Sequence, residues 1–445
     1  MTDLLQSPTS GDELITELRT WLEENWDPDL TVAEWWDRLG PSGWAAPTLP
    51  VNAFGRGVAR SVGVQIAQEI TQFGALGAPN GLGLLLAAPT IADHGTPEQI
   101  DTFVRDIVTG RQAWCQLFSE PGAGSDLAGL TTRAELDGDE WIVNGQKVWT
   151  SLGQTADLAM LIARTAPDLP KHQGITYFAL DMHQPGVDVR PLREMTGHAM
   201  FNETFLTDVR VPTSSVIGGL NNGWAVANST LGHERSGLGS GGGSAAVAVA
   251  MPGTVAGNLP RRAGDFVPAK GAKRVVRSDA AGRAARRAGM QDLLVDLARG
   301  NGTGADPIIR QDLVRLYTLN ELGRFNAERL KAVRSTGRDV PGMANIAKLS
   351  MSNIVRLQRD VGLRIVGAQG MLHAYDPADQ PALDEATGNP FLSAVTMSAL
   401  YAQAPSIYGG TDQVQRNIIG ERVLGLPKEP SNDKGKPFSE LPKNG

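Results

Sequence analysis

The chain has 445 residues, a length that predicts roughly two to four domains. Hydrophobic residues make up 41% of it and charged residues 20%, a balance typical of a folded globular protein. The net charge of -7 argues against nucleic acid as the main partner, and the single cysteine, Cys115, excludes an intramolecular disulfide and a thiolate metal site.

The first residues of the chain, Met1 to Leu5, lack the basic and then apolar run of a secretory signal. No uninterrupted apolar stretch is long enough to span a bilayer. Together with the lone cysteine, which suits a reducing compartment, these features predict a cytoplasmic protein with no integral membrane association.

Residues 1–112 have the texture of a helical domain. One group of apolar residues recurs at spacings of four, four and three, which places one stripe on a helix: Val62, Ile66, Ile70 and Phe73. Thr96 is a predicted helix N-cap, with Pro97 in the first turn and Gln99 three residues after the cap. We therefore expect an N-terminal α-helical domain.

Residues 113–222 consist of short strand-like segments. The pattern predicts strands at residues 131–136, 141–143, 158–163, 175–181 and 205–211. Asp137 to Asp139 suits a turn between the first two, and Asn144-Gly145 is a pair that tight hairpin turns prefer. A middle domain built as an antiparallel β-sandwich or barrel fits these segments.

Helical periodicity returns over residues 223–426. It predicts helices at residues 309–319, 346–357 and 392–402, the first of them starting at Asp306-Pro307. The order of helices, sheet and more helices predicts an α+β fold class, and few enzyme architectures place a sheet domain between two helical ones.

Residues 237–305 interrupt this C-terminal domain with glycine and with basic side chains. Gly237 to Gly243 is dense in glycine and serine, and the basic residues that follow far outnumber Asp265 and Asp279. A solvated, partly mobile insertion is the simpler interpretation, and a basic surface that attracts an acidic partner or CoA phosphates is the alternative. The polar residues 427–445 are expected to form a loose tail.

Three short segments carry candidate chemistry. Ser119 to Asp126 combines glycines with hydroxyls, Lys147 to Ser151 places an indole before two hydroxyls, and Ile407 to Asn417 places two glycines before a helix that Thr411 can cap. Taken singly, they could be a tight polar turn, a core tryptophan and an interhelical turn. None matches a dinucleotide-binding or Walker pattern.

Together these segments resemble the acyl-CoA dehydrogenase family. The most specific are Ser119 to Asp126, Asn144 to Trp149 and Tyr408 to Arg416, and the resemblance covers residues 10–428 apart from the insertion. It implies a helical domain, a middle β domain and a C-terminal four-helix-bundle domain. It also implies FAD as cofactor, an acyl-CoA substrate in fatty-acid β-oxidation, and an electron-transfer flavoprotein as electron acceptor.

The resemblance also implies which residues hold the ligands. Those expected at the flavin are Gln116, Phe118, Ser119, Ser125, Trp149, Thr150, Ser151, Arg364, Gly367, Ala368, Thr411 and Gln413. Those expected at the substrate are Ser125, Arg235, Gly409 and Gly410. Arg364 replaces the glutamine that is usual in the family.

The catalytic base needs a separate argument. Most members of the family carry their catalytic glutamate directly after the tyrosine of the C-terminal motif, where this chain has Gly409. A subgroup that includes isovaleryl-CoA and long-chain acyl-CoA dehydrogenases carries it on the first helix of the C-terminal domain, just before an arginine. Glu234 and Arg235 stand there, so the resemblance implies Glu234 as base, against the alternative of a surface carboxylate paired with a basic neighbour.

The resemblance leaves three functions open. The first is an active dehydrogenase, as a homo-tetramer or homo-dimer, that converts a branched or bulky acyl-CoA to the trans-2-enoyl-CoA. The second is a catalytically silent subunit that completes the FAD site of a paralogous partner in a hetero-oligomer, because Gly409 lacks a carboxylate and the usual interface residues are not evident at 299–304. The third is an acyl-CoA oxidase, which differs only in whether O2 reaches the reduced flavin.

Overall fold

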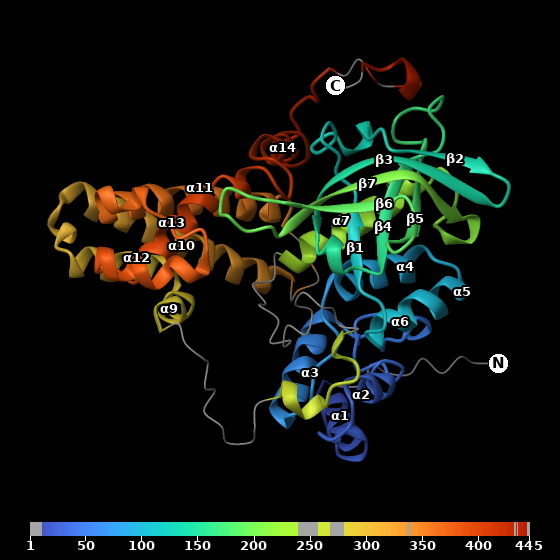
Figure 1. The fold of residues 1–445 in the computed structure, drawn as a ribbon, viewed down its shortest axis with the longest axis horizontal. Helices are drawn as coiled ribbons and strands as arrows, with labels where there is room; N and C mark the ends of the chain where they lie inside the picture. The colour runs from blue at the N-terminus through green and yellow to red at the C-terminus, as the bar shows by residue number, and fades with distance from the viewer. Residues whose placement is uncertain are drawn as a thin grey trace. The chain divides into compact units, whose positions relative to one another are not determined.

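The computed structural model describes residues 11–238, 257–267, 280–334, 336, 338, 340–430, 433 and 435–442. The chain divides into two compact units. Unit 1 comprises Met1–Leu192, Met200–Val275 and Asp433–Gly445, and unit 2 comprises Arg193–Ala199 and Val276–Asn432. Figure 1 shows the chain coloured from blue at the N-terminus to red at the C-terminus.

The N-terminal part of unit 1 is helical, as predicted. Its helices are α1 (Gly11–Asn25), α2 (Val32–Leu39), α3 (Arg60–Phe73), α4 (Ala88–His94), α5 (Pro97–Gln99) and α6 (Arg105–Val108). The predicted stripe lies on α3, where Ile66 and Ile70 are buried. Thr96 caps α5 in a reciprocal capping box with Gln99, which confirms the predicted helix start.

The middle of unit 1 is a sheet of eight strands. They are β1 (Trp114–Leu117), β2 (Arg133–Asp137), β3 (Glu140–Ser151), β4 (Leu158–Arg164), β5 (Ile175–Asp181), β6 (Val187–Leu192), β7 (Phe201–Pro212) and β8 (Val216–Ile217). Seven of them follow the order β6-β7-β3-β2-β4-β5-β8, and β1 pairs with β4. The sheet is mixed rather than wholly antiparallel, because β4 runs parallel to both β1 and β2.

The pair Asn144-Gly145 does not form the hairpin turn that its residue types predicted. It lies inside the long strand β3, which pairs with β7 on both sides of a register shift between Val143 and Gly145. Glycine is required there because an added Cβ would lie 2.3 Å from the Thr132 hydroxyl oxygen. The Asn144 amide nitrogen instead donates to the Asp208 carboxylate across the sheet at 3.0 Å.

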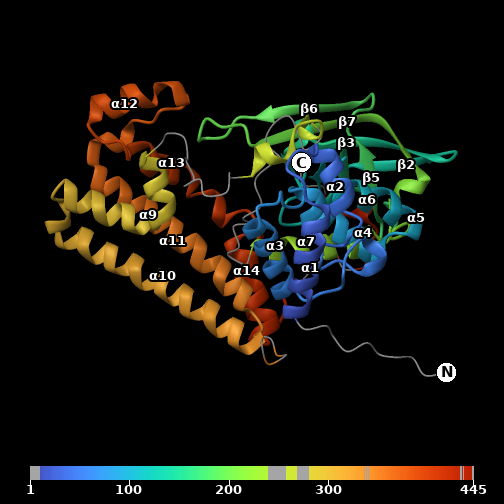
Figure 2. The ribbon, with the colours of Figure 1, turned by 90° about the horizontal axis from the view of Figure 1, so that it is seen from below.

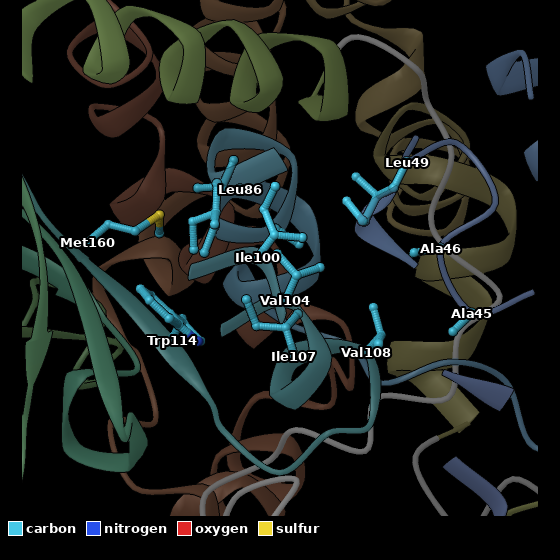
Figure 3. Packing of buried hydrophobic residues seen from close by; sticks show 14 of the residues in the cluster. Ala45, Ala46, Leu49, Leu86, Ile100, Val104, Ile107, Val108, Trp114 and Met160 are labelled. Carbon is cyan, nitrogen blue, oxygen red and sulfur yellow. The ribbon is translucent and has the colours of Figure 1, made fainter. Parts of the chain in front are cut away.

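Helices and sheet of unit 1 share one apolar core. Figure 3 shows Leu86, Ile100, Val104 and Ile107 from the helical part gathered beside Trp114 from the sheet. All five belong to one cluster of buried side chains. This shared core fixes the start of β1, the strand that leads into the Ser119 to Asp126 loop.

Unit 1 also holds helix α7 (Gly223–Leu238), which the sequence analysis assigned to the C-terminal domain. Thr230, at its middle, is fully buried and its hydroxyl lies 3.0 Å from the Thr90 hydroxyl of α4 and 3.3 Å from the Tyr177 hydroxyl of β5. Farther along α7, His233 lies 3.1 Å from the Asp93 carboxylate. These contacts bind α7 to the helices and to the sheet at once.

Unit 2 is helical, with the C-terminal bundle that was expected. Its helices are α9 (Ala280–Gly300), α10 (Pro307–Arg334), α11 (Met343–Val366), α12 (Gln380–Thr387), α13 (Leu392–Tyr401) and α14 (Asp412–Ile418). Buried residues of α9, α10, α11 and α13 form its apolar core, and Figure 2 shows α10 and α11 as long neighbouring helices.

The predicted insertion at 237–305 is too long at its C-terminal end. Leu294 and Ala298 of α9 are buried in the core of unit 2, because they form an apolar stripe within a polar segment. Residues 257–267 lie against the N-terminal helices, where the Val32 amide donates to the Arg261 carbonyl at 2.8 Å. Residues 239–256 and 268–279 of the predicted insertion lie outside the described residues.

The C-terminal segment differs from the expected loose tail. Within unit 1, Phe438 is only 9% exposed, and its amide donates to the Leu169 carbonyl at 2.9 Å. The buried ring of Phe438 therefore helps to anchor a segment whose polar composition predicted no anchor. Among the described residues, no helix combines the length and the apolar character that a bilayer crossing requires.

Candidate active site

Trp149 is an exposed indole held by an unusual backbone. A register shift between Lys147 and Thr150 forms a bulge in β3, and Trp149 in that bulge has a φ of 64°. Its side chain is 55% exposed, with the ring edge-on to Phe201 at a centroid distance of 5.7 Å. The alternative of a core tryptophan is therefore wrong, because more than half of the side chain is exposed.

The Ser119 to Asp126 loop is anchored by a buried ion pair. The Lys147 ammonium lies 2.8 Å from the Glu120 carboxylate and also donates to the Phe118 carbonyl at 3.0 Å. Glu120 further accepts from the backbone amides of Thr131 at 2.7 Å and Thr132 at 2.9 Å. The pair thus closes the loop at both of its ends.

Burial alone would raise the pKa of the Glu120 carboxyl, but Lys147 and the threonine donors outweigh it and hold the pKa at about 2. Burial lowers the pKa of the Lys147 ammonium despite Glu120. The two shifts have opposite consequences for stability. Four donors converge on the Glu120 carboxylate, so the charged form of Glu120 is the favoured one.

The other residues expected at the flavin in unit 1 lie around this loop and bulge. Gln116 and Ser119 are partly exposed and Ser125 is exposed. Phe118 is buried edge-on to Tyr177 at 5.9 Å, and Ser151 ends β3. Thr150 is fully buried, its hydroxyl lies 3.4 Å from the Thr204 hydroxyl, and its carbonyl accepts from the Asn202 side-chain amide at 3.0 Å.

Glu234 extends the buried face of α7 by one turn. The buried positions of this helix include Val226, Ala227 and Thr230, and Glu234 lies four residues beyond Thr230. Residues four apart share a helix face, so Glu234 lies on the side that packs on β5 and not on the opposite, solvent-facing side. Glu234 is partly buried, and the side chain of Arg235 is outside the described structure.

In unit 2, the motif that begins at Tyr408 forms a tight turn before α14. Gly409 and Gly410 have φ values of 63° and 80°, a region that favours glycine, and Thr411 caps the helix by accepting from the Val414 amide at 3.2 Å. The predicted cap is confirmed. An added Cβ at Gly409 would meet no atom within 4 Å.

Side chains that the sequence analysis passed over hold this turn. Gln415 donates to the Gly409 carbonyl at 2.8 Å and accepts from the Asn345 amide nitrogen at 2.6 Å. The buried Asp412 carboxylate lies 3.1 Å from the Lys348 ammonium and 3.3 Å from the Arg356 guanidinium. Both partners come from α11, so the turn is tied to the bundle, and a sequence spacing of more than fifty residues hides such pairs.

The remaining expected residues occupy the end of α11 and the start of α14. Arg364, which stands where the family usually has a glutamine, forms an ion pair with the Asp312 carboxylate of α10. This pair balances the positive charge of the arginine. Gly367 and Ala368 are exposed just after α11, and Gln413 is exposed in the first turn of α14. Glu234, Ser125 and Trp149 thus belong to unit 1, and Arg364, Gly409 and Thr411 to unit 2.

The chain matches three domain models of one family. The acyl-CoA dehydrogenase N-terminal domain matches residues 11–111, the middle domain residues 115–209 and the C-terminal domain residues 273–424. Acyl-CoA dehydrogenase IpdE1 of Mycobacterium tuberculosis (strain ATCC 25618 / H37Rv) is 33% identical over 395 residues, which is 89% of this chain and 88% of the relative.

Two solved structures extend the likeness to the fold. The Tcur3481-Tcur3483 steroid ACAD is 26% identical with a TM-score of 0.64, over 96% of this chain and 100% of that one. The ChsE4-ChsE5 complex from Mycobacterium tuberculosis is 26% identical with a TM-score of 0.61, over the same shares. With its three domains matched in order, this chain belongs to the acyl-CoA dehydrogenase family of oxidoreductases.

Proposed function

We propose that this enzyme oxidises an acyl-CoA thioester to the trans-2-enoyl-CoA, with Glu234 as the base that removes the α proton. One observation carries the proposal. Position 409, where most of the family keep the catalytic glutamate, is a glycine, while Glu234 lies on the face of α7 that packs on the sheet. A carboxylate at the second known position of the family thus compensates for the one missing at the first.

FAD is the cofactor of this enzyme, and the residues present fit it. The exposed indole of Trp149 offers a flat face for a ring system, Ser151 at the end of the same strand offers a hydroxyl, and Ser125 offers another from the loop after β1. When bound, FAD supplies the acceptor for the hydride that leaves the β carbon. The role of this chain is then to orient the thioester and to take one proton.

The proton on the α carbon of a thioester is too weakly acidic for an unaided carboxylate. The thioester carbonyl must therefore be polarised by donors that are already in place. The backbone amide of Gly409 is our candidate for such a donor. Gln415 fixes the turn by donating to the Gly409 carbonyl, and glycine has no side chain that could obstruct the amide. Glu234 accepts the proton in the same step.

The test is the Glu234→Gln variant, purified with FAD and mixed with acyl-CoA in the absence of air. We expect flavin reduction to slow by about 10²-fold to 10⁴-fold, as when a general base is lost. Glu234→Asp should recover part of the rate. Asp93→Asn is the matched control and should keep the wild-type rate. It removes the carboxylate of α4 that lies beside His233, the residue before Glu234 on α7. An unchanged rate in Glu234→Gln would falsify the assignment.

We further propose a branched or ring-bearing acyl group as the substrate, rather than a short straight chain of fatty-acid β-oxidation. Gly409 and Gly410 carry no side chains that could restrict the acyl group. One protein of similar fold, Tcur3481-Tcur3483, is named a steroid ACAD. Comparison of straight, branched and cyclic acyl-CoA thioesters at equal concentration tests this. A strict preference for short straight chains contradicts it.

A silent subunit in a hetero-oligomer is the second candidate, because the related ChsE4-ChsE5 structure is a complex of two named chains. Gly409 in place of glutamate is the feature of this chain that favours it. Purification of the chain alone as a yellow homo-oligomer that reduces its flavin with acyl-CoA would exclude this candidate. Electron-transfer flavoprotein is the proposed acceptor, and rapid peroxide formation with air as sole acceptor would identify an oxidase instead.

A further inference from the structure

The C-terminal segment of unit 1 lies on the loop between β4 and β5, residues 165–174. The Phe438 amide donates to the Leu169 carbonyl at 2.9 Å, and the Ser439 amide donates to the Pro167 carbonyl at 2.9 Å. Pro437 forms an isolated bridge with Pro170. These backbone hydrogen bonds dock the short 3-10 helix Phe438–Glu440 onto the loop.

The same segment covers a buried arginine. The ring of Phe438 lies over the Arg164 guanidinium at 3.7 Å from the ring centroid. Arg164 is 3% exposed, and it donates to the carbonyls of Ala128 at 2.6 Å and Leu130 at 3.3 Å. Burial lowers the pKa of Arg164 to about 10, so the guanidinium stays charged at neutral pH. Ala128 and Leu130 follow the Ser119 to Asp126 loop, so Arg164 ties the end of that loop to the sheet beneath Phe438.

A second cation bridges the loop and the C-terminal segment directly. The Lys171 ammonium lies 3.0 Å from the Asp126 carboxylate and 2.5 Å from the Asp433 carboxylate, and its side chain is 15% exposed. Asp126 follows Ser125, and the Asp126 carbonyl accepts from the Gly129 amide at 2.9 Å. Asp433 thus acts on the Ser125 turn through one shared lysine.

We propose that Asp433 and Phe438 form a C-terminal clasp, and that Arg164 and Lys171 are positioning residues through which it holds Ser125 and its loop for acyl-CoA binding. The inference deepens the proposed function and rests on it for the identity of the ligand. The clasp acts on the population of the ordered loop, so it raises affinity for the thioester and leaves the proton-transfer step alone.

The clasp also reaches the start of the helix that carries Glu234. His172, next to Lys171, lies edge-on to the Trp224 ring in the first turn of α7 at 4.9 Å. The β4–β5 loop therefore contacts the clasp, the Ser119 to Asp126 loop and α7 at once. Loosening the clasp is expected to loosen the β4–β5 loop and the Ser119 to Asp126 loop. Helix α7 should stay in place, because Thr230 anchors it independently.

Hydrogen exchange of the full-length holoenzyme tests the clasp without reference to the reaction. Asp433→Asn removes one carboxylate and keeps the Lys171 to Asp126 pair, and Phe438→Ala removes the ring over Arg164. We expect peptides that span 120–130 to exchange about tenfold faster in both variants, with no change in peptides of α7. Lys436→Ala and Glu440→Gln, exposed positions in the same segment, are the controls and should exchange like wild type.

Steady-state kinetics give the second measurement. We expect KM for the acyl-CoA to rise about tenfold in Asp433→Asn and Phe438→Ala, with kcat within twofold of wild type and the FAD content unchanged. Normal exchange of 120–130 in both variants overturns the clasp, and so does a fall in kcat at unchanged KM. Because exchange is measured without substrate, failure of the Glu234 assignment would leave this result interpretable.

Discussion

Glu120 and Lys147 are oppositely charged side chains with almost no exposure to water, 4% and 0%. Both belong to motifs that are recognisable in the sequence, but their residue types alone predict no role for either. The structure shows why they are needed, because they close the loop that carries Ser125 and adjoin the bulge that presents Trp149. A buried pair of this kind is strongly destabilising when one partner alone is removed.

A double-mutant cycle should expose this coupling. Lys147→Met leaves the Glu120 charge buried without its cation, and we expect a loss of about 3–5 kcal/mol of stability. Glu120→Gln keeps an acceptor for the Thr131 amide and should cost less. In the double variant the combined loss should be smaller than the sum of the two, measured as thermal unfolding of all four proteins. Strictly additive losses would show that the two charges do not interact.

Acidity provides an independent measurement on the same residue. The pKa of Glu120 is held at about 2 in the fold, below its usual value of 4.5. A depressed carboxyl pKa stabilises the fold above the unfolded pKa, and that stabilisation is lost as the pH falls toward the folded pKa. The unfolding temperature of wild type should therefore fall more between pH 5 and pH 3 than that of Glu120→Gln. Parallel curves for the two proteins would contradict the assigned shift.

At the scale of elements, the helical stripe, the helix caps and the positions of five strands were predictable, whereas the irregularities of β3 were not. The stripe of α3 and the caps at Thr96 and Thr411 follow from local periodicity and local hydrogen bonding. The Asn144-Gly145 pair gave a wrong prediction because its local preference is for a turn. Its actual conformation is set by close contact with Thr132, the residue just before β2. Local rules cannot see such a neighbour.

The same limit applies to the candidate site. The three motifs and Glu234 could be named from the chain, because each is a short run of adjacent residues. The partners of these motif residues lie far away in sequence: Lys147 pairs with Glu120, Lys171 with Asp126 and Lys348 with Asp412. Pairing of distant residues is a property of the fold, so these supports appear only in the structure.

The turn at Gly409 permits a gain-of-function experiment. Its φ of 63° makes a side chain cost about 1–2 kcal/mol, but no atom lies within 4 Å of an added Cβ. Gly409→Glu should therefore fold, and in the Glu234→Gln background we expect it to restore part of the rate of flavin reduction by acyl-CoA. Gly409→Gln in the same background is the control, because it has the same shape without the base. Equal rates in both double variants would count against a carboxylate acting from position 409.

At the scale of the whole molecule, one face of α10 requires an explanation. Ile309 and Leu316 of this helix are buried in the core of unit 2, whereas Val314, Tyr317 and Phe325 are 58%, 55% and 55% exposed within the described structure. Spacings of three and eight residues place these three on one face. An exposed stripe with two aromatic rings is typical of a subunit interface.

We therefore predict that this face of α10 is covered by a second subunit, identical or paralogous. The double variant Tyr317→Glu/Phe325→Glu buries two charges in such an interface, so it should reduce the molar mass of the purified protein in light scattering toward that of a single chain. Arg315→Glu is the matched control, because it adds negative charge to the same helix on a different face and should leave the mass unchanged. If the double variant keeps the wild-type mass, the oligomer is assembled elsewhere, and the aromatic stripe belongs to the surface of the assembled enzyme.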